Sequence, residues 1–253
     1  MPPEERVKTK CPILFQDSWL LIVHKPEGVL SHPNVHGKKT QDSGQKHIRA
    51  AFEGSYDFDK RCFETPGGPV WLIHRLDQDT SGILMAALDY DTAGKCRSAF
   101  DKEIVRKWYR ALLCGRLTAA GMWMDHLVVK KQARFVRTVV LRGKPPNAKL
   151  RYQVCRFFPR EGLSLVEIEL LSGKTHQIRV QAASRHHPVI SDDIYGNFAL
   201  NKKLAKSLGV RRLFLHACAV EMSHPVTGKK LHLEDPLPAS LTSAIHRMSD
   251  AAN

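Results

Sequence analysis

Hydrophobic and charged positions alternate most regularly in the segment SLVEIELL. Within it Val166, Ile168 and Leu170 occupy every second position, and Glu167 and Glu169 stand between them. Successive side chains of a β-strand point to opposite faces of a sheet, so a period of two predicts a strand with one buried and one solvated face.

Continuous apolar runs predict further strands. The run WLLIV ends at Lys25-Pro26-Glu27-Gly28, where the proline and the glycine favour a turn. The other predicted strands are PVWLIHRL (69–76), SGILMAAL (81–88), WYRALLCG (108–115) and RRLFLHACAVEM (211–222). Asp77 is therefore expected on the connection between two apolar strands.

Helices are expected at fewer places. Residues 92–105 have helical spacing, with Thr92 as the predicted N-cap. The segment THQIRVQAA (175–183) is interpreted as a helix start, and a short helix is expected at 45–52 within a loop over residues 32–68.

Strands dominate, and the helices between them follow no regular βαβ rhythm, which favours an α+β fold. The chain is expected to build one mixed, largely antiparallel sheet with flanking helices and loops. We predict a polar N-terminal tail over residues 1–12, one continuous domain over 13–238, and a C-terminal tail or short helix over 239–253.

The chain is strongly basic, with 39 Lys and Arg against 25 Asp and Glu and a formal net charge of +14. Basic side chains bind phosphate backbones by releasing condensed counterions, so nucleic acid is the first candidate partner. The alternative is a basic surface that serves solubility alone. Part of the charge is concentrated in one polar stretch, which we expect to form a phosphate-tracking surface that follows an RNA or DNA backbone. Its residues are Lys130, Lys131, Arg134, Arg137, Arg142 and Lys144.

Membrane and secreted classes are not indicated. The sequence has no run of about 18 apolar residues that could span a bilayer, and its start lacks the pattern of a signal peptide. The six cysteines are scattered without a C-x-x-C pair. We therefore expect reduced thiols in a cytoplasmic protein, without a disulfide frame or a structural zinc site.

Two local patterns resemble known kinds of binding site. Gly173-Lys174-Thr175 has the end of a P-loop, but the earlier glycine that the pattern requires is Ile168, inside the predicted strand. Asp77 and Asp79 could hold a hard cation such as magnesium, which prefers oxygen ligands and binds proteins through carboxylates. Short acidic pairs in turns are usually solvated, so this alternative needs a test.

Three segments are informative when they are considered together: HRLDQDTSG at 74–82, KWY at 107–109 and SGKTHQIRV at 172–180. Together they resemble the RluA-type family of RNA pseudouridine synthases. The resemblance extends to HKPEG at 24–28, to HHPVISDDIYG at 186–196 and to LFLHACAV followed by HPVTG. It covers residues 13 to 238, and it departs from the usual family pattern at His24, Ser172, Lys174 and Ser191.

The resemblance implies a catalytic centre in a cleft across the sheet. The reaction breaks the bond between uridine N1 and C1′, turns the base and rejoins it through C5, without a cofactor or a metal. Asp77 is the implied carboxylate, acting as nucleophile on ribose or base, or as a base at the ribose. Arg179 is the implied partner that keeps Asp77 ionised and oriented, and Tyr109 is expected against the target base.

The same resemblance implies a binding pocket for an extruded nucleotide. Arg75 is expected to enter the vacated base stack, because its planar cation suits both stacking and phosphate contact. Ile178 and Leu215 are expected as apolar walls, and His74 is assigned to the substrate pocket with them. The implied partner is ribosomal or transfer RNA, and the expected state is a monomer without an obligate protein partner.

Two hypotheses of other classes compete with this interpretation. A catalytically silent RNA-binding module would keep the basic surface but would not need Asp77, Tyr109 and Arg179 together. A metal-dependent nuclease or phosphatase would need a cation on Asp77 and Asp79, and EDTA would abolish its activity.

Overall fold

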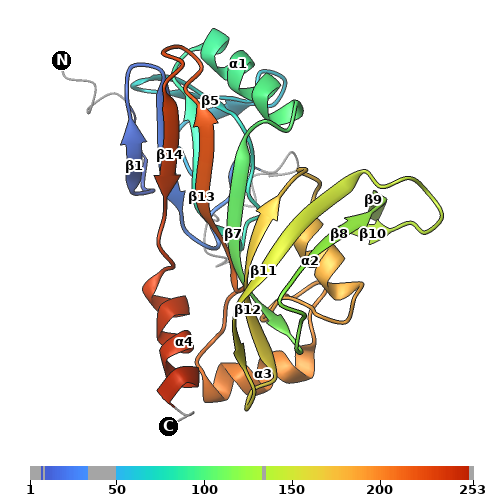
Figure 1. The fold of residues 1–253 in the computed structure, drawn as a ribbon. Coiled ribbons are helices and arrows are strands. Elements are labelled where there is room, and N and C mark those ends of the chain that lie inside the picture. Colours follow the sequence, from blue (N-terminus) through green and yellow to red (C-terminus); the bar gives the residue numbers. More distant parts are fainter. Residues whose placement is uncertain (1–6, 8, 34–49, 133–134, 251–253) are drawn as a thin grey trace. The chain divides into compact units, whose positions relative to one another are not determined.

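The computed structural model describes residues 7, 9–33, 50–132 and 135–250. These residues fall into two units (Figure 1). The first unit contains Met1–Val105 and Val220–Asp235, and the second contains Arg106–Ala219 and Pro236–Asn253. Strand β13 (Leu215–Ser223) contributes residues to both. The predicted domain bounds at residues 13 and 238 stay a prediction.

The first unit is built on an antiparallel sheet in the order β3-β4-β5-β6-β2-β1. The strands in this order are β1 (Ile13–Gln16), β2 (Leu20–Lys25), β3 (Ser55–Asp57), β4 (Cys62–Thr65), β5 (Gly68–Leu72) and β6 (Ser81–Ala87). A further strand of this unit, β14 (Lys230–Glu234), pairs with β13. Helix α1 (Tyr90–Asp101) follows β6.

The centre of this sheet is buried on both faces. Ile83 and Met85 of β6 pack in one core cluster with Ala93 of α1, and Leu84 and Ala86 pack in another. Every residue of β6 is buried. Burial of both faces explains why this strand has a continuous apolar sequence instead of an alternating one.

The sequence placed the start of α1 too late. Its N-cap is Asp89, whose Oδ1 accepts a hydrogen bond from the amide of Thr92 at 2.8 Å. Thr92 was predicted as the cap, but it lies inside the helix and supplies one of the first-turn N–H groups that a cap must satisfy.

Residues 32–68 were expected to be a loop, and this was wrong where β3 and β4 form. Residues 45–49 of the expected short helix lie outside the described residues. Its last residues are not helical, since Ala50 forms a bridge with Leu30 and Phe52 forms one with Thr9.

The second unit also contains an antiparallel sheet, with the strand order β7-β12-β11-β8. Its strands are β7 (Arg106–Cys114), β8 (Ala120–Asp125), β11 (Ala148–Phe158) and β12 (Leu163–Leu170), and a separate hairpin is formed by β9 (Leu127–Gln132) and β10 (Phe135–Val140). The period of two in SLVEIELL is confirmed, because Val166, Ile168 and Leu170 are buried and both glutamates are partly exposed.

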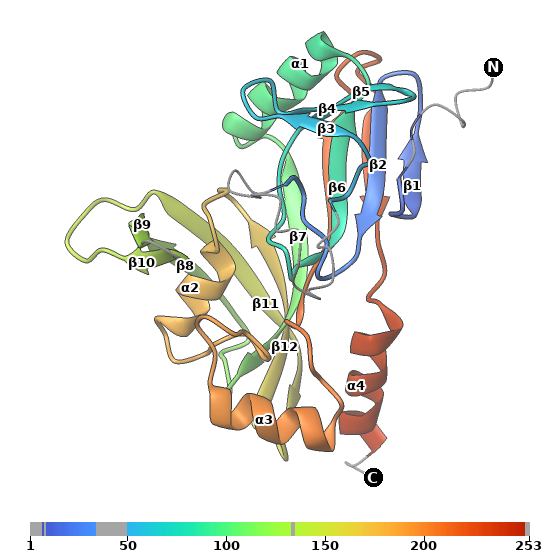
Figure 2. The same ribbon diagram turned by 180° about the vertical axis from the view of Figure 1, so that it is seen from behind.

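Three helices complete the second unit, α2 (Gln177–Ala183), α3 (Phe198–Ser207) and α4 (Ala239–Asp250). Leu204 of α3 and Leu241 of α4 join Phe158 and Leu163 in one core cluster. Figures 1 and 2 both show α2 beside the β9–β10 hairpin. The predicted α+β class with a largely antiparallel sheet is confirmed.

Helices of the described residues are all too short or too polar to cross a lipid bilayer.

Candidate active site

Three of the predicted site residues, His74, Arg75 and Asp77, lie in the first unit on the connection between β5 and β6. A turn begins at Asp77, because the amide of Thr80 donates a hydrogen bond to the backbone carbonyl oxygen of Asp77 at 3.1 Å. Ser31 fixes the preceding residue. Its hydroxyl donates to the Leu76 carbonyl at 2.8 Å and accepts from the Leu76 amide at 3.0 Å.

Lys25 ties this connection to the turn after β2. Its side chain is completely buried, and Nζ donates to the carbonyl oxygens of Pro26 at 2.9 Å, Val29 at 2.8 Å and Gln78 at 2.9 Å. The Gly28 amide also donates to Gln78 at 2.9 Å. A buried ammonium has a large desolvation cost unless its donors are satisfied, and these carbonyls satisfy all three.

Removal of this ammonium tests its role in holding the loop. We expect Lys25→Met to lower the free energy of unfolding by about 2–4 kcal/mol, since three inward-facing carbonyls lose their donor. Urea denaturation measures the change. Lys10→Met is the control, because Lys10 is an exposed lysine of the same unit that pairs with Glu53. Equal unfolding midpoints for the two variants would contradict the assignment.

His74 attaches the β5–β6 connection to the rest of the first unit. Its Nε2 accepts a hydrogen bond from the Met85 amide at 3.2 Å, and its ring stacks on Phe100 with centroids 5.0 Å apart. These contacts orient the start of the loop. The role of His74 in substrate binding stays a prediction.

Arg75 extends from the same loop and is exposed. Its Nη1 donates to Nε2 of His32 at 2.9 Å. The imidazole of His32 stacks in turn on Tyr56 of β3, with centroids 5.1 Å apart and planes 7° apart. The sequence identified Arg75 but not the histidine that receives its hydrogen bond.

The other four predicted residues belong to the second unit. Tyr109 lies on β7 opposite Ile168 of β12 and is buried. Ile178 and Arg179 are neighbours on α2, and Leu215 begins β13. All of these side chains are buried. The predicted pairing of Asp77 with Arg179 joins residues of different units and stays a prediction.

Arg179 has a bidentate partner that the sequence analysis did not assign. Its Nε donates to Asp192 Oδ2 at 2.7 Å and its Nη2 to Asp192 Oδ1 at 2.9 Å, with both side chains buried. Asp192 Oδ1 also accepts from the amides of Ile194 and Tyr195. Burial favours the neutral acid, but the Arg179 guanidinium and these amides outweigh it and hold the pKa of Asp192 below its ordinary value.

Tyr195 connects α2 to the β9–β10 hairpin. The guanidinium carbons of Arg179 and Arg137 lie 5.5 and 5.6 Å from its ring centroid. Its hydroxyl accepts from the Thr138 amide at 2.9 Å and lies 3.0 Å from Nδ1 of His176. The signal that could have found Asp192 and Tyr195 is the motif SDDIYG, to which the sequence analysis gave no role.

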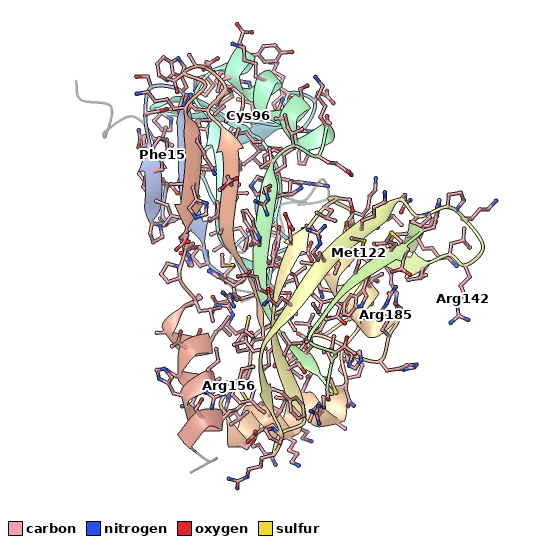
Figure 3. All side chains as sticks on the ribbon, in the orientation of Figure 1. Phe15, Cys96, Met122, Arg142, Arg156 and Arg185 are labelled. Carbon is pink, nitrogen blue, oxygen red and sulfur yellow. The ribbon has the colours of Figure 1, made fainter. Side chains whose placement is uncertain are left out.

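Four members of the predicted phosphate-tracking surface are described with side chains, and all four are exposed: Lys130, Arg137, Arg142 and Lys144. Figure 3 shows Arg142 pointing away from the ribbon in the loop that follows β10. Arg134 and the side chain of Lys131 lie outside the described residues.

The described residues contain no group of three or more His, Cys, Asp or Glu side chains that could hold one metal ion. All six cysteines are free thiols. Burial raises the pKa of Cys96 to about 12 and that of Cys218 to about 11, so both thiols stay protonated at neutral pH.

Comparison with known proteins places these residues in a family context. The family model described as RNA pseudouridylate synthase matches residues 19–184. Ribosomal large subunit pseudouridine synthase C of Vibrio cholerae is 31% identical over 239 residues, which are 94% of this chain and 70% of that protein. The tRNA pseudouridine synthase C of Salmonella typhimurium is 28% identical over 243 residues, covering 92% of this chain and 88% of that protein.

A solved structure shares the fold. Human RNA Pseudouridylate Synthase Domain Containing 4 superposes with a TM-score of 0.66 at 23% sequence identity, and the match covers 94% of this chain and 92% of that one.

Proposed function

Because the chain belongs to the RNA pseudouridylate synthase family, we propose that it converts specific uridines of ribosomal or transfer RNA to pseudouridine, with Asp77 as the catalytic carboxylate. The match to the family over residues 19–184 carries this proposal, because it includes Asp77, Tyr109 and Arg179. The names of the two curated relatives, one for ribosomal and one for transfer RNA, support these substrates.

The reaction is an isomerisation. The bond between N1 and C1′ breaks, the detached base turns within the pocket, and a bond forms between C5 and C1′. C5 then loses its proton to solvent and N1 gains one, so no oxidant, reductant or energy source is consumed. The ionised carboxylate of Asp77 starts the reaction, either by attack on the ribose or the base or by removal of a ribose proton.

Arg179 supplies the positive charge that keeps Asp77 ionised in this scheme. Its Nε and Nη2 donate to Asp192, which holds the guanidinium by two hydrogen bonds. Asp192 is then a positioning residue, since it fixes the plane of the guanidinium without touching the substrate.

Tyr109 is assigned to the target base. Stacking of a base on an aromatic ring contributes about 1–3 kcal/mol, and the hydroxyl can relay the proton that leaves C5. Ile178 and Leu215 are assigned to the apolar walls of the pocket, and His74 is assigned to substrate binding.

The target uridine must leave the RNA stack to reach these groups, at a cost of a few kcal/mol. Arg75 is assigned to the vacated position, which its exposure supports. The exposed basic residues Lys130, Arg137, Arg142 and Lys144 are assigned to RNA phosphates. The enzyme is proposed to act as a cytoplasmic monomer without an obligate protein partner, and its six free thiols are compatible with a reducing compartment.

The experiment that tests this function is release of tritium from RNA labelled with tritium at uridine C5. We expect release by the purified chain in the presence of excess EDTA, at the rate seen without it. A chelator-sensitive activity, or cleavage of the RNA in place of tritium release, would favour the metal-dependent hydrolase instead.

A further inference from the structure

His32 has both ring nitrogens engaged in a way that fixes its protonation state. Nδ1 lies 2.8 Å from the Pro33 carbonyl oxygen, and Nε2 lies 2.9 Å from Nη1 of Arg75. A carbonyl only accepts and a guanidinium only donates, so Nδ1 carries the hydrogen and Nε2 offers its lone pair. The hydrogen bond from Arg75 therefore requires the neutral imidazole, protonated at Nδ1.

An aromatic cluster of the first unit holds this imidazole in place. Its ring stacks on Tyr56, and Phe58 meets it edge-on at 5.9 Å. Tyr56 packs in turn against Phe63, whose side chain is fully buried, at 4.7 Å. The imidazole thus rests on a support that continues into the core, whereas Arg75 is an exposed side chain with many accessible rotamers.

Burial and, after it, two neighbouring cations favour the neutral form of His32. Burial lowers the pKa of His32 below its ordinary value of 6.5, and the cations of Arg75 and Arg61 lower it further. Tyr56 stacks on the ring, and burial raises the pKa of its hydroxyl, so this group stays uncharged near neutrality. At pH 7 the acceptor for Arg75 is therefore present.

We propose that His32 is a positioning residue that holds the Arg75 guanidinium in place before it enters the RNA stack. This inference rests on the proposed function and extends it, because it names the group that prepares the nucleotide-extruding arginine. A long arginine that is already fixed loses less side-chain freedom when it binds than one that must first be ordered. Protonation of His32 would turn Nε2 into a donor and repel Arg75.

Two substitutions separate the acceptor from the stacking. His32→Phe keeps a ring on Tyr56 but removes the acceptor, and we expect kcat/KM for tritium release to fall about tenfold, the scale of one lost hydrogen bond. The probe is total RNA labelled at uridine C5 and taken from cells that lack the gene. His32→Gln keeps a neutral acceptor and should restore most of the activity. His232→Phe, at an exposed histidine of the same unit, is the control.

A double-mutant cycle tests whether His32 acts through Arg75. We expect Arg75→Ala combined with His32→Phe to be no slower than Arg75→Ala alone, because the acceptor has nothing left to hold. Losses that multiply would overturn the proposal and leave His32 as a purely structural residue. Circular dichroism on each variant establishes that it is folded.

The pH dependence of kcat/KM is a second test, and it does not require the His32→Phe variant to fold. The ratio of wild-type to His32→Gln kcat/KM should be constant from pH 7.5 to about 6.5 and should fall below it, since only the wild type loses its acceptor on protonation. A ratio that stays constant at every acidic pH at which the wild type remains folded would overturn the proposal. Failure of the proposed function itself is distinct, because the wild-type chain would then release no tritium.

Discussion

Asp77→Asn is expected to reduce tritium release from C5-labelled uridine in RNA by about four orders of magnitude or more, to background. The asparagine side chain has nearly the same shape but neither attacks carbon nor accepts a proton at neutral pH. Binding of the RNA should persist, because the exposed basic residues that are assigned to phosphates are unchanged. A filter-binding titration beside the tritium assay separates the two effects.

Asp79→Asn is the matched control for this experiment, because Asp79 is an exposed carboxylate two residues along the same loop. We expect its activity to stay within about twofold of wild type. Equal loss in both variants would point to a cation shared by the two carboxylates. Undiminished turnover in Asp77→Asn would remove the mechanistic assignment.

The second large effect is expected at the buried pair of Arg179 and Asp192. Asp192→Asn leaves the Arg179 guanidinium without its bidentate carboxylate. Breaking a buried ion pair on one side costs about 3–5 kcal/mol of folding free energy, because the remaining charge is buried without compensation. Activity should fall with it, about a hundredfold, since Arg179 loses the contact that fixes its plane.

The stability difference between wild type and Asp192→Asn should depend on pH in a defined direction. The folded-state pKa of Asp192 is lowered, so its contribution is present in full above the unfolded value of about 3.9 and is lost as pH falls through the folded value. Urea denaturation should show the full difference between wild type and variant at pH 7 and a shrinking difference below about pH 4. Asp193→Asn, at the exposed neighbour, is the control. The pair would not stabilise the fold if both variants unfolded at the same urea concentration.

Local sequence patterns were sufficient to predict strands in which every residue of a face has the same burial. The apolar run of β6 and the alternation of β12 both reflect burial of whole faces, which a sequence displays directly. The position of Asp77 between two strands followed from the apolar runs at 69–76 and 81–88.

Strand β11 shows why other elements were missed. Ala148, Leu150 and Tyr152 are buried and alternate with exposed Lys149 and Arg151, but the stretch before them is polar and basic, and a bulge between Val154 and Arg156 breaks the period. Strands β3 and β4 are only three and four residues long. Periodicity cannot be recognised over so few positions.

The support of the candidate site depends on contacts between distant residues. Lys25 is 53 residues from Gln78, and His32 is 43 residues from Arg75. No local pattern encodes such a contact, because it follows from how the strands bring the two segments together. The sequence could therefore identify the residues assigned to chemistry, but not those that hold them.

The most direct measurement of the central claim is a map of pseudouridine in total RNA from cells with and without the gene. At least one uridine of ribosomal or transfer RNA should be unmodified in cells without it. Modification should return with the wild-type gene and should not return with Asp77→Asn. An unchanged map, or a site restored by Asp77→Asn, would contradict the account.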